Sequence, residues 1–259
     1  MGDSELRDLV KSYIYLNAVL PQLEEVVAFD KEAQELCKGW NCTIQMHCSG
    51  GPGVCLIFKD GKCSAKLGTV SLPTIGLYFS SPTKVVNMFE KKGKVVPLPW
   101  WGVWHLGILG KFTKLTDLME KYLKPTEEML KDRKIFEFHT RMQLMVAAYA
   151  LKAVGEHDPK VMPIVKKTIN GIMEMRVMPD GPAVYIDKQG GTITPTKGLA
   201  PEYMVSMQIK GIDLTYDMLT GKVDFMEALG LCKIELHGMI GFAENMAVVL
   251  EKIEKYIEP

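Results

Sequence analysis

The chain has 259 residues, and its 31 lysines and arginines balance 31 aspartates and glutamates, so its formal charge is zero. Binding to nucleic-acid phosphates needs a basic excess, and we therefore expect no nucleic-acid partner. Charged residues interrupt the N-terminal stretch, and the longest apolar run, Met145 to Leu151, is too short to span a bilayer. These features predict a cytoplasmic protein with no signal peptide and no membrane span.

Periodicity in the first half predicts two helices, a three-stranded meander, a fourth strand, a helix, a fifth strand and a closing helix. Pro21 suits the first turn of the second helix, and the segment 59–62 has the composition of a hairpin turn. The expected elements are helices at 4–20 and 21–38, strands at 41–48, 54–58, 63–67 and 74–79, a helix from residue 82, a strand at 104–109 and a helix at 113–122.

The second half repeats this order. A long helical stretch at its start ends near Gly155, and Asp158-Pro159 opens the next helix. The element list predicts an α+β fold in which helices cover one face of a mainly antiparallel sheet. The remaining expected elements are strands at 171–177, 183–187, 192–196 and 204–209, a helix, a short apolar helix at 225–229, a strand at 233–239 and a closing helix at 244–256.

Four short motifs of the first half recur in the second half, in the same order and at nearly constant spacing. Coincidence of single motifs is common, but an ordered set of this kind indicates an internal repeat. We therefore predict two homologous domains, at residues 1–125 and 126–259, each of ordinary domain size. The recurring segments are 51–54 at 181–184, 93–95 at 221–223, 107–110 at 238–241 and 120–125 at 254–259.

The segment that begins at Gly221-Lys222 resembles the C-terminal part of the sterol carrier protein type 2 family. Asp224 follows the Gly-Lys pair, and then come a short apolar helix, a last strand and a closing helix. The pair also occurs in the first half, as Gly93-Lys94. The resemblance implies two tandem sterol-carrier-like domains, each a five-stranded, mainly antiparallel sheet covered by helices, with a tunnel for a lipid or another apolar molecule.

The chain departs from the family pattern at two places. An acidic residue usually follows the last strand of the family, but Lys111-Phe112 and Phe242-Ala243 stand there. In the first half, a proline- and tryptophan-rich run from Pro97 to Trp104 replaces the short apolar helix. The second domain is therefore the one expected to bind a ligand.

Methionine is the most informative residue type in the second domain, because its flexible thioether side chain adapts to apolar ligands of varied shape. The alternative interpretation is that these methionines fill the core, and the tryptophans either gate a first pocket or plug a domain interface. We expect Met226 to roof the cavity. The predicted ligand-binding residues are Met207, Met218, Leu219, Phe225, Met226, Leu229, Met239, Phe242 and Met246, with Trp100, Trp101 and Trp104 near the pocket of the first domain.

Five of the six cysteines lie in the segment 37–63, but no two have the spacing of paired zinc ligands. Cys42, Ile44, Met46 and Cys48 have the period of one strand face, which favours small buried side chains over a metal or redox site. We expect no bound metal, no disulfide and no cofactor.

We predict a binding or carrier protein rather than an enzyme, with an apolar or amphipathic small molecule such as a fatty acid, an acyl chain or a sterol as its ligand. The sequence has no Gly-x-Ser-x-Gly motif, no Rossmann glycine pattern and no phosphate loop. Two alternatives stay open. One is an enzyme for an acyl or thioester substrate, with His237, Glu235 or Asp224 as candidates, and the other is a structural interaction module with a filled core.

Overall fold

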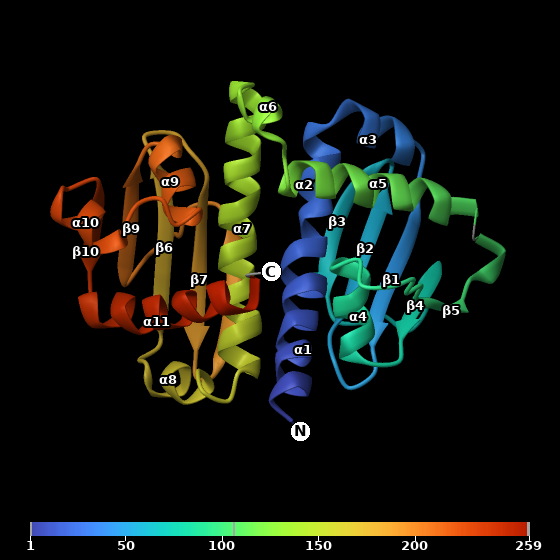
Figure 1. The fold of residues 1–259 in the computed structure, drawn as a ribbon, viewed down its shortest axis with the longest axis horizontal. Coiled ribbons are helices and arrows are strands. Elements are labelled where there is room, and N and C mark those ends of the chain that lie inside the picture. The colour runs from blue at the N-terminus through green and yellow to red at the C-terminus, as the bar shows by residue number, and fades with distance from the viewer. Residues whose placement is uncertain (1, 106, 258–259) are drawn as a thin grey trace. The chain divides into compact units, whose positions relative to one another are not determined.

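The computed structural model describes residues 2–105 and 107–257. The chain divides into two compact units, Met1–Thr126 and Glu127–Pro259. Each unit holds one five-stranded sheet with helices packed against it, as Figure 1 shows.

Unit 1 begins with α1 (Asp3–Ile14), which continues through a π-helical turn and a 3-10 turn into α2 (Leu23–Phe29). The helix expected at 21–38 is divided at Asp30, whose backbone is extended. Its carboxylate accepts a hydrogen bond from the backbone N–H of Ala33 at 2.8 Å and so caps the next helix. The other elements are α3 (Lys31–Cys37), β1 (Cys42–Cys48), β2 (Gly53–Lys59), β3 (Lys62–Leu67), β4 (Ile75–Phe79), α4 (Pro82–Phe89), β5 (Leu98–Trp101), the 3-10 turn η3 (Val103–His105) and α5 (Gly107–Leu123).

Unit 2 has the same order of elements, and its long helix α7 lies against β7 and β8. It also contains the short helix α10, which has no counterpart among the described residues of unit 1. Its elements are α6 (Glu127–Leu130), α7 (Arg133–His157), α8 (Met162–Lys167), β6 (Gly171–Met178), β7 (Ala183–Gln189), β8 (Thr192–Lys197), β9 (Val205–Lys210), α9 (Ile212–Leu219), α10 (Phe225–Gly230), β10 (Ile234–Gly238) and α11 (Ile240–Ile257).

The two sheets have the same topology. The strand order is β3-β2-β1-β4-β5 in unit 1 and, read in the same direction, β8-β7-β6-β9-β10 in unit 2. β1 pairs with β4 and β6 with β9 in parallel, and all other neighbours are antiparallel. The predicted fold class, a duplicated and mainly antiparallel α+β fold, is confirmed.

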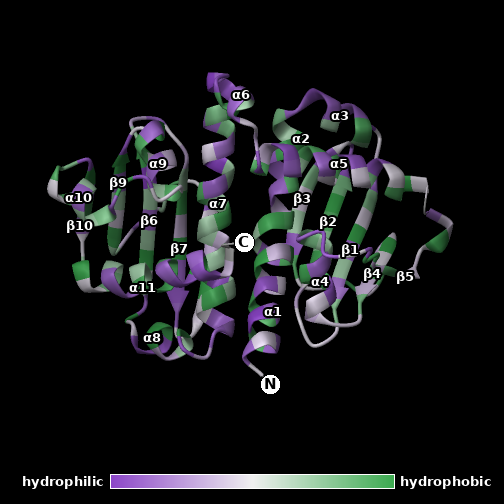
Figure 2. Ribbon diagram, in the orientation of Figure 1, coloured by the Kyte–Doolittle hydropathy of each residue, from purple (hydrophilic) through white to green (hydrophobic). Residues whose placement is uncertain are grey.

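One face of each sheet carries the core. In β1 the alternating side chains of Cys42, Ile44, Met46 and Cys48 are all buried, which confirms the strand face predicted from the cysteine spacing. Figure 2 shows apolar colour along the strands of both sheets, whereas the helices alternate between apolar and polar stretches. This alternation is the pattern of helices that cover an apolar sheet face on one side and meet water on the other.

The fifth strand of unit 1 lies earlier than the expected 104–109. It spans Leu98–Trp101, residues 103–105 form η3, Leu106 lies outside the described residues, and α5 already begins at Gly107 rather than near Thr113. The physical reason is the indole ring of Trp100, which covers Gly76 of β4. A Cβ atom at Gly76 would come within 2.5 Å of that ring, so the glycine provides the space in which the strand settles.

Gly102 directly follows β5, and Gly238 is the last residue of β10. The two glycines therefore stand at equivalent points of the two sheets. Their φ angles are +72° and +108°, and an added Cβ atom would lie 1.9 Å from the carbonyl oxygen of Thr74 or 2.1 Å from that of Met204. Only glycine fits such a close approach. The sequence-based pairing of Gly107 with Gly238 is therefore wrong, because Gly107 begins α5 whereas Gly238 ends β10.

The closing helices are tethered in the same way in both units. Tyr122 Oη donates a hydrogen bond to Asp30 Oδ2 at 2.6 Å, and Tyr256 Oη donates one to Asp158 Oδ2 at 2.9 Å. Burial, reinforced by the neighbouring Asp30 carboxylate, raises the pKa of Tyr122, so the phenol keeps its proton and stays a donor. The two tyrosines belong to the segments 120–125 and 254–259, so this recurring motif has a structural role.

A shielded ion-pair cluster joins α1 of unit 1 to the residues that follow α4. Lys11 Nζ of α1 lies 2.5 Å from Glu90 Oε1, which also accepts a hydrogen bond from Tyr15 Oη at 3.0 Å, while Lys92 Nζ lies 2.6 Å from Oε2. Burial raises the pKa of Glu90, but hydrogen bonds from Lys11, Lys92 and Tyr15 outweigh it and lower the pKa to about 2.

We predict that unit 1 loses stability in acid through Glu90. Because its folded pKa lies below the unfolded value of about 4.3, the stabilisation is complete above that pH and is lost as the pH falls towards about 2. Denaturation followed by tryptophan fluorescence isolates unit 1, which holds all four tryptophans. The stability gap between wild type and Glu90→Gln should shrink below about pH 4. A gap that stays constant with pH, as expected for the control Glu35→Gln at an exposed position of unit 1, would contradict this.

We also predict that Gly238→Ala destabilises unit 2 far more than Gly221→Ala. Gly221 has a φ of +68° with nothing within 4 Å of an added Cβ, so its substitution tests backbone strain alone and should cost about 1 kcal/mol. Gly238→Ala adds a collision with the Met204 carbonyl and should cost about 3–4 kcal/mol. Circular dichroism measures the loss, with tryptophan fluorescence as the check on unit 1. Equal losses for the two variants would refute the close approach.

Candidate functional site

The predicted ligand-binding residues of unit 2 fall into three groups by exposure. Met207 of β9 and Phe242 and Met246 of α11 are buried, with exposed fractions of 6%, 1% and 0%, and these two elements pack against each other. They form part of the apolar layer between the sheet and its helices. Half-buried around it are Met218, Leu219, Phe225 and Leu229 on α9 and α10.

Met226 and Met239 make up the third group and lie at the surface. Their exposed fractions are 68% and 50%, so the Met226 side chain does not cover the layer in the way the sequence suggested. Asp224 caps α10 by accepting a hydrogen bond from the backbone N–H of Glu227 at 2.9 Å. The lining of a cavity by the nine residues stays a prediction.

The three tryptophans lie at the surface of unit 1, on β5 and η3. Trp100, Trp101 and Trp104 are 44%, 39% and 68% exposed. The rings of Trp101 and Trp104 meet edge to face, with centroids 5.7 Å apart, and Trp100 meets His47 in the same manner at 5.9 Å. They are separate from the buried layer of unit 1.

Equivalent core positions differ in the flexibility of their side chains, at three positions in favour of unit 2 and at one, Met119 and Ile253, in favour of unit 1. The registers of the parallel strand pairs and the shared tyrosine tether define the equivalences. At three positions a branched or aromatic side chain in unit 1 is a methionine in unit 2, and all six side chains are buried. The pairs are Ile44 and Met173, Leu77 and Met207, and Phe112 and Met246. Met173 was not singled out from the sequence, because only the strand register reveals its place in the layer.

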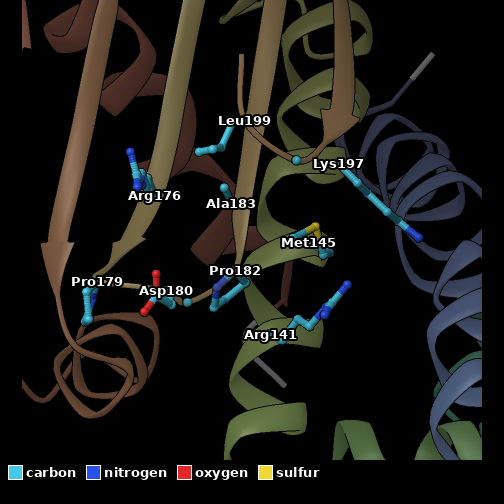
Figure 3. Close-up of a pocket in the computed structure, with 11 residues that line it drawn as sticks. Arg141, Met145, Arg176, Pro179, Asp180, Pro182, Ala183, Lys197 and Leu199 are labelled. Atoms are coloured by element: carbon cyan, nitrogen blue, oxygen red, sulfur yellow. The ribbon is translucent and has the colours of Figure 1, made fainter. Parts of the chain in front are cut away.

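A hollow of about 380 Å³ opens in unit 2 beside the β6–β7 turn. Figure 3 shows the side chains of Arg141 and Lys197 on one side of it and Arg176 on the other. Asp180 adds an acidic group, and Met145 lies between Arg141 and Lys197. The cations do not converge on one point. Sequence reasoning did not find this hollow, because its residues come from several elements, and the recurring segment 181–184 among them has no known binding pattern.

A second hollow, of about 560 Å³, lies on the unit 1 sheet face opposite the core. His47, Tyr78 and Trp100 line it, together with the polar loop after β3. Burial lowers the pKa of His47, and its Nδ1 atom has no hydrogen-bond partner among the described residues. A neutral imidazole with a free ring nitrogen can bind a small polar group. Of the predicted ligand-binding residues, Trp100 lines this hollow.

Gln45 and Glu174 are buried at equivalent positions on this face of the two sheets. Gln45 Oε1 accepts a hydrogen bond from the backbone N–H of Val70 at 2.7 Å, and Glu174 Oε2 accepts one from the N–H of Ala200 at 2.9 Å. Each side chain therefore anchors the loop after the third strand of its sheet. Because an amide makes this bond in unit 1, loop anchoring itself does not require the negative charge of Glu174.

The candidates for chemistry lie apart from both the layer and the hollows. His237 Nε2 is 3.3 Å from Glu235 Oε2, whose other oxygen pairs with Lys210, and the His237 and Glu235 side chains are 50% and 40% exposed. The hydrogen bond from Lys210 lowers the pKa of Glu235. This arrangement is a surface ion pair of Lys210 and Glu235, on β9 and β10, with the His237 ring beside it.

Four of the six cysteines, Cys37, Cys42, Cys48 and Cys55, are buried. None of the six is in a disulfide, and burial raises the pKa of Cys42 and Cys48 to about 11, which keeps both as thiols at neutral pH. Among the described residues no group of three or more His, Cys, Asp or Glu side chains is placed to hold a metal ion.

Comparisons with known proteins give similarity at the level of solved structures. No protein-family model matches the sequence, and no curated protein does. The sterol carrier protein domain 2 of Helicoverpa armigera is 21% identical, covers 45% of this chain and 92% of its own, and has a TM-score of 0.36. Palmitated SCP2L2 from Aedes aegypti is 20% identical over 40% of this chain and 90% of its own, with a TM-score of 0.32.

A ubiquinone synthesis protein, UbiJ-SCP2, is also similar, at 10% identity over 39% of this chain and 87% of its own, with a TM-score of 0.33. Each of these structures is thus matched over most of its own length and over less than half of this chain. Within the part of the chain that the structure describes, no helix is both long and apolar enough to cross a bilayer.

We predict that Glu174→Gln is tolerated and Glu174→Ala is not. A glutamine keeps an acceptor for Ala200 N–H, as Gln45 does in unit 1, and its amide can donate to the hydroxyl of Ser206, which now donates to Glu174 at 3.0 Å. Alanine leaves the buried loop N–H without an acceptor and should cost about 1–3 kcal/mol, against less than about 1 kcal/mol for glutamine. Thermal unfolding by circular dichroism compares the two. Equal destabilisation would argue for a role that needs the charge.

Proposed function

We propose that the protein binds an apolar or amphipathic small molecule, a fatty acid or another acyl-chain lipid, in unit 2 between the sheet and helices α9–α11. The strongest support is that the core of unit 2 has methionine at the positions equivalent to Ile44, Leu77 and Phe112 of unit 1. A branched or aromatic side chain fills one shape, whereas methionine has three rotatable bonds and repacks around a guest at low cost.

The covering elements of unit 2 also suit entry of a ligand. α9 and α10 are short, and their apolar residues Met218, Leu219, Phe225 and Leu229 are only half buried. Segments with little buried apolar surface open at low free-energy cost. The resemblance of the Gly221 to Met239 segment to the sterol carrier protein type 2 family is a second, sequence-based support. Palmitate is the natural probe, because the Aedes aegypti structure is of a palmitated protein.

We predict that palmitate stabilises unit 2 and not unit 1. At a hundredfold excess over its dissociation constant a ligand adds about 2.7 kcal/mol of stability to the unit that binds it. The measurements are displacement of a fluorescent fatty-acid probe by palmitate and thermal unfolding of the full chain. Tryptophan fluorescence follows unit 1 separately. Absence of probe binding, with no shift of either transition, would reject the carrier function.

The decisive variant carries the unit 1 side chains in unit 2, namely Met173→Ile, Met207→Leu and Met246→Phe. The equivalent core of unit 1 already accepts these residues, so the fold should survive, with a cost of less than about 1.5 kcal/mol for each swap of similar volume. Probe binding should fall at least tenfold. Met226→Trp, at a surface position, is the matched control and should bind like wild type. Unchanged affinity in the triple variant would place the ligand outside this layer.

A further inference from the structure

The segment 91–114 of unit 1 has a composition unlike the rest of this neutral chain. It contains five lysines, three tryptophans and no acidic residue. It runs from the end of α4 through the edge strand β5 and η3 into the first turns of α5, at the edge of unit 1 that Figure 1 labels β5. The apolar side chains it leaves at the surface are Val96, Leu98, Trp100, Trp101, Val103 and Trp104, which are between 39% and 77% exposed. We call these and the five lysines the tryptophan–lysine surface.

Two of the lysines are partly neutralised, because Lys91 pairs with Glu120 at 2.8 Å and Lys92 with Glu90 at 2.6 Å. Lys94, Lys111 and Lys114 are exposed and have no ion-pair partner among the described residues. These three positive charges lie on the same segment as the exposed indole rings and are not held in ion pairs among the described residues.

Unit 2 provides an internal comparison. Its equivalent segment, 221–248, also exposes apolar side chains, among them Met226 and Ile240. It has no tryptophan, and its two lysines stand against four acidic residues. The combination of cationic and indole groups is thus a property of one copy and not a requirement of the shared fold.

We propose that the tryptophan–lysine surface docks the protein on anionic lipid bilayers. Indole rings favour the interface between lipid headgroups and water, since they are apolar with one polar N–H, and lysines beside them are attracted to acidic headgroups. Pro97 and Pro99 lack the N–H groups that an added β-strand would need, which disfavours pairing of the β5 edge with another protein chain. An anionic bilayer needs no backbone N–H groups for binding, and its negative charge attracts the lysines.

This docking surface is independent of the proposed ligand layer in unit 2. Vesicle binding without palmitate binding would retain the docking surface and reject the carrier function. Palmitate binding without vesicle binding would retain the carrier function and reject the docking surface. The two failures are therefore distinguishable.

The test measures binding of the full chain to phosphatidylcholine vesicles with and without phosphatidylserine. Three of the four tryptophans lie in the surface, and the fourth, Trp40, is 9% exposed. Insertion of the indoles should therefore shift the emission to shorter wavelength. We expect the shift and co-sedimentation only with phosphatidylserine, and we expect both to weaken as salt shortens the Debye length from about 10 Å at 0.1 M to about 3 Å at 1 M.

The charge-reversal variant is Lys94→Glu, Lys111→Glu and Lys114→Glu. Each lysine near an anionic bilayer adds roughly fivefold to affinity, so the triple variant should bind at least about a hundredfold more weakly. The matched control reverses the charges of Lys59, Lys62 and Lys66, which are exposed on β2 and β3, away from β5 in the same sheet. It changes the net charge by the same amount and should bind the vesicles far better than the first triple variant. Trp104→Ser, at a position 68% exposed, should reduce the emission shift without loss of fold.

Several outcomes would overturn the proposal. Equal binding to neutral and anionic vesicles, equal loss in the two triple variants, or no binding at all would each reject it. An emission shift that appears without vesicles at high protein concentration and disappears on dilution would assign the surface to a second copy of the chain instead.

Discussion

The close approach of two backbones at the end of the last strand is the constraint on which both units depend. At Gly102 and Gly238 the chain passes so near the carbonyl of the residue before the neighbouring strand that no Cβ atom fits. This contact ends the strand and releases the chain into the closing helix. That helix then brings Phe112 in unit 1, or Phe242 and Met246 in unit 2, into the core, and the tyrosine tether holds its far end.

The duplication allows each copy to serve as a control for the other. A buried carboxylate such as Glu174 invites a catalytic interpretation. Its counterpart is Gln45, which cannot titrate and accepts the equivalent hydrogen bond from the equivalent loop of unit 1. The shared role is therefore structural. Without the second copy, burial and charge alone would have made Glu174 a prominent active-site candidate.

The positions at which the two copies differ are informative, because the shared fold does not require those differences. Both cores satisfy one backbone arrangement, so the replacement of Ile44, Leu77 and Phe112 by methionine is not demanded by the fold. Likewise, the surface beside the last strand is rich in lysine and tryptophan in one copy and acidic in the other. We infer that the two units have diverged towards different tasks, one at the ligand and the other at the lipid surface.

Much of this architecture follows from the sequence alone, because periodic burial and turn chemistry are local properties. The alternation of Cys42, Ile44, Met46 and Cys48 predicted a buried strand face, and the recurring motifs predicted a duplicated α+β fold. The same reasoning placed the fifth strand of unit 1 too late, since nothing local shows that Trp100 needs the space above Gly76.

The burial of the candidate positions was decided by the tertiary structure. By composition Met207 and Met226 are the same residue type in one methionine-rich stretch, yet the first is 6% and the second 68% exposed. Exposure depends on which strand or helix lies across a side chain, and that is a long-range property. Likewise, the parallel register of β6 and β9 revealed Met173 as part of the layer, and the position of β5 and η3 at the sheet edge left three indoles in contact with water. The sequence by itself thus determined the elements and their repetition, while contacts between distant residues determined which side chains are available to a ligand or a membrane.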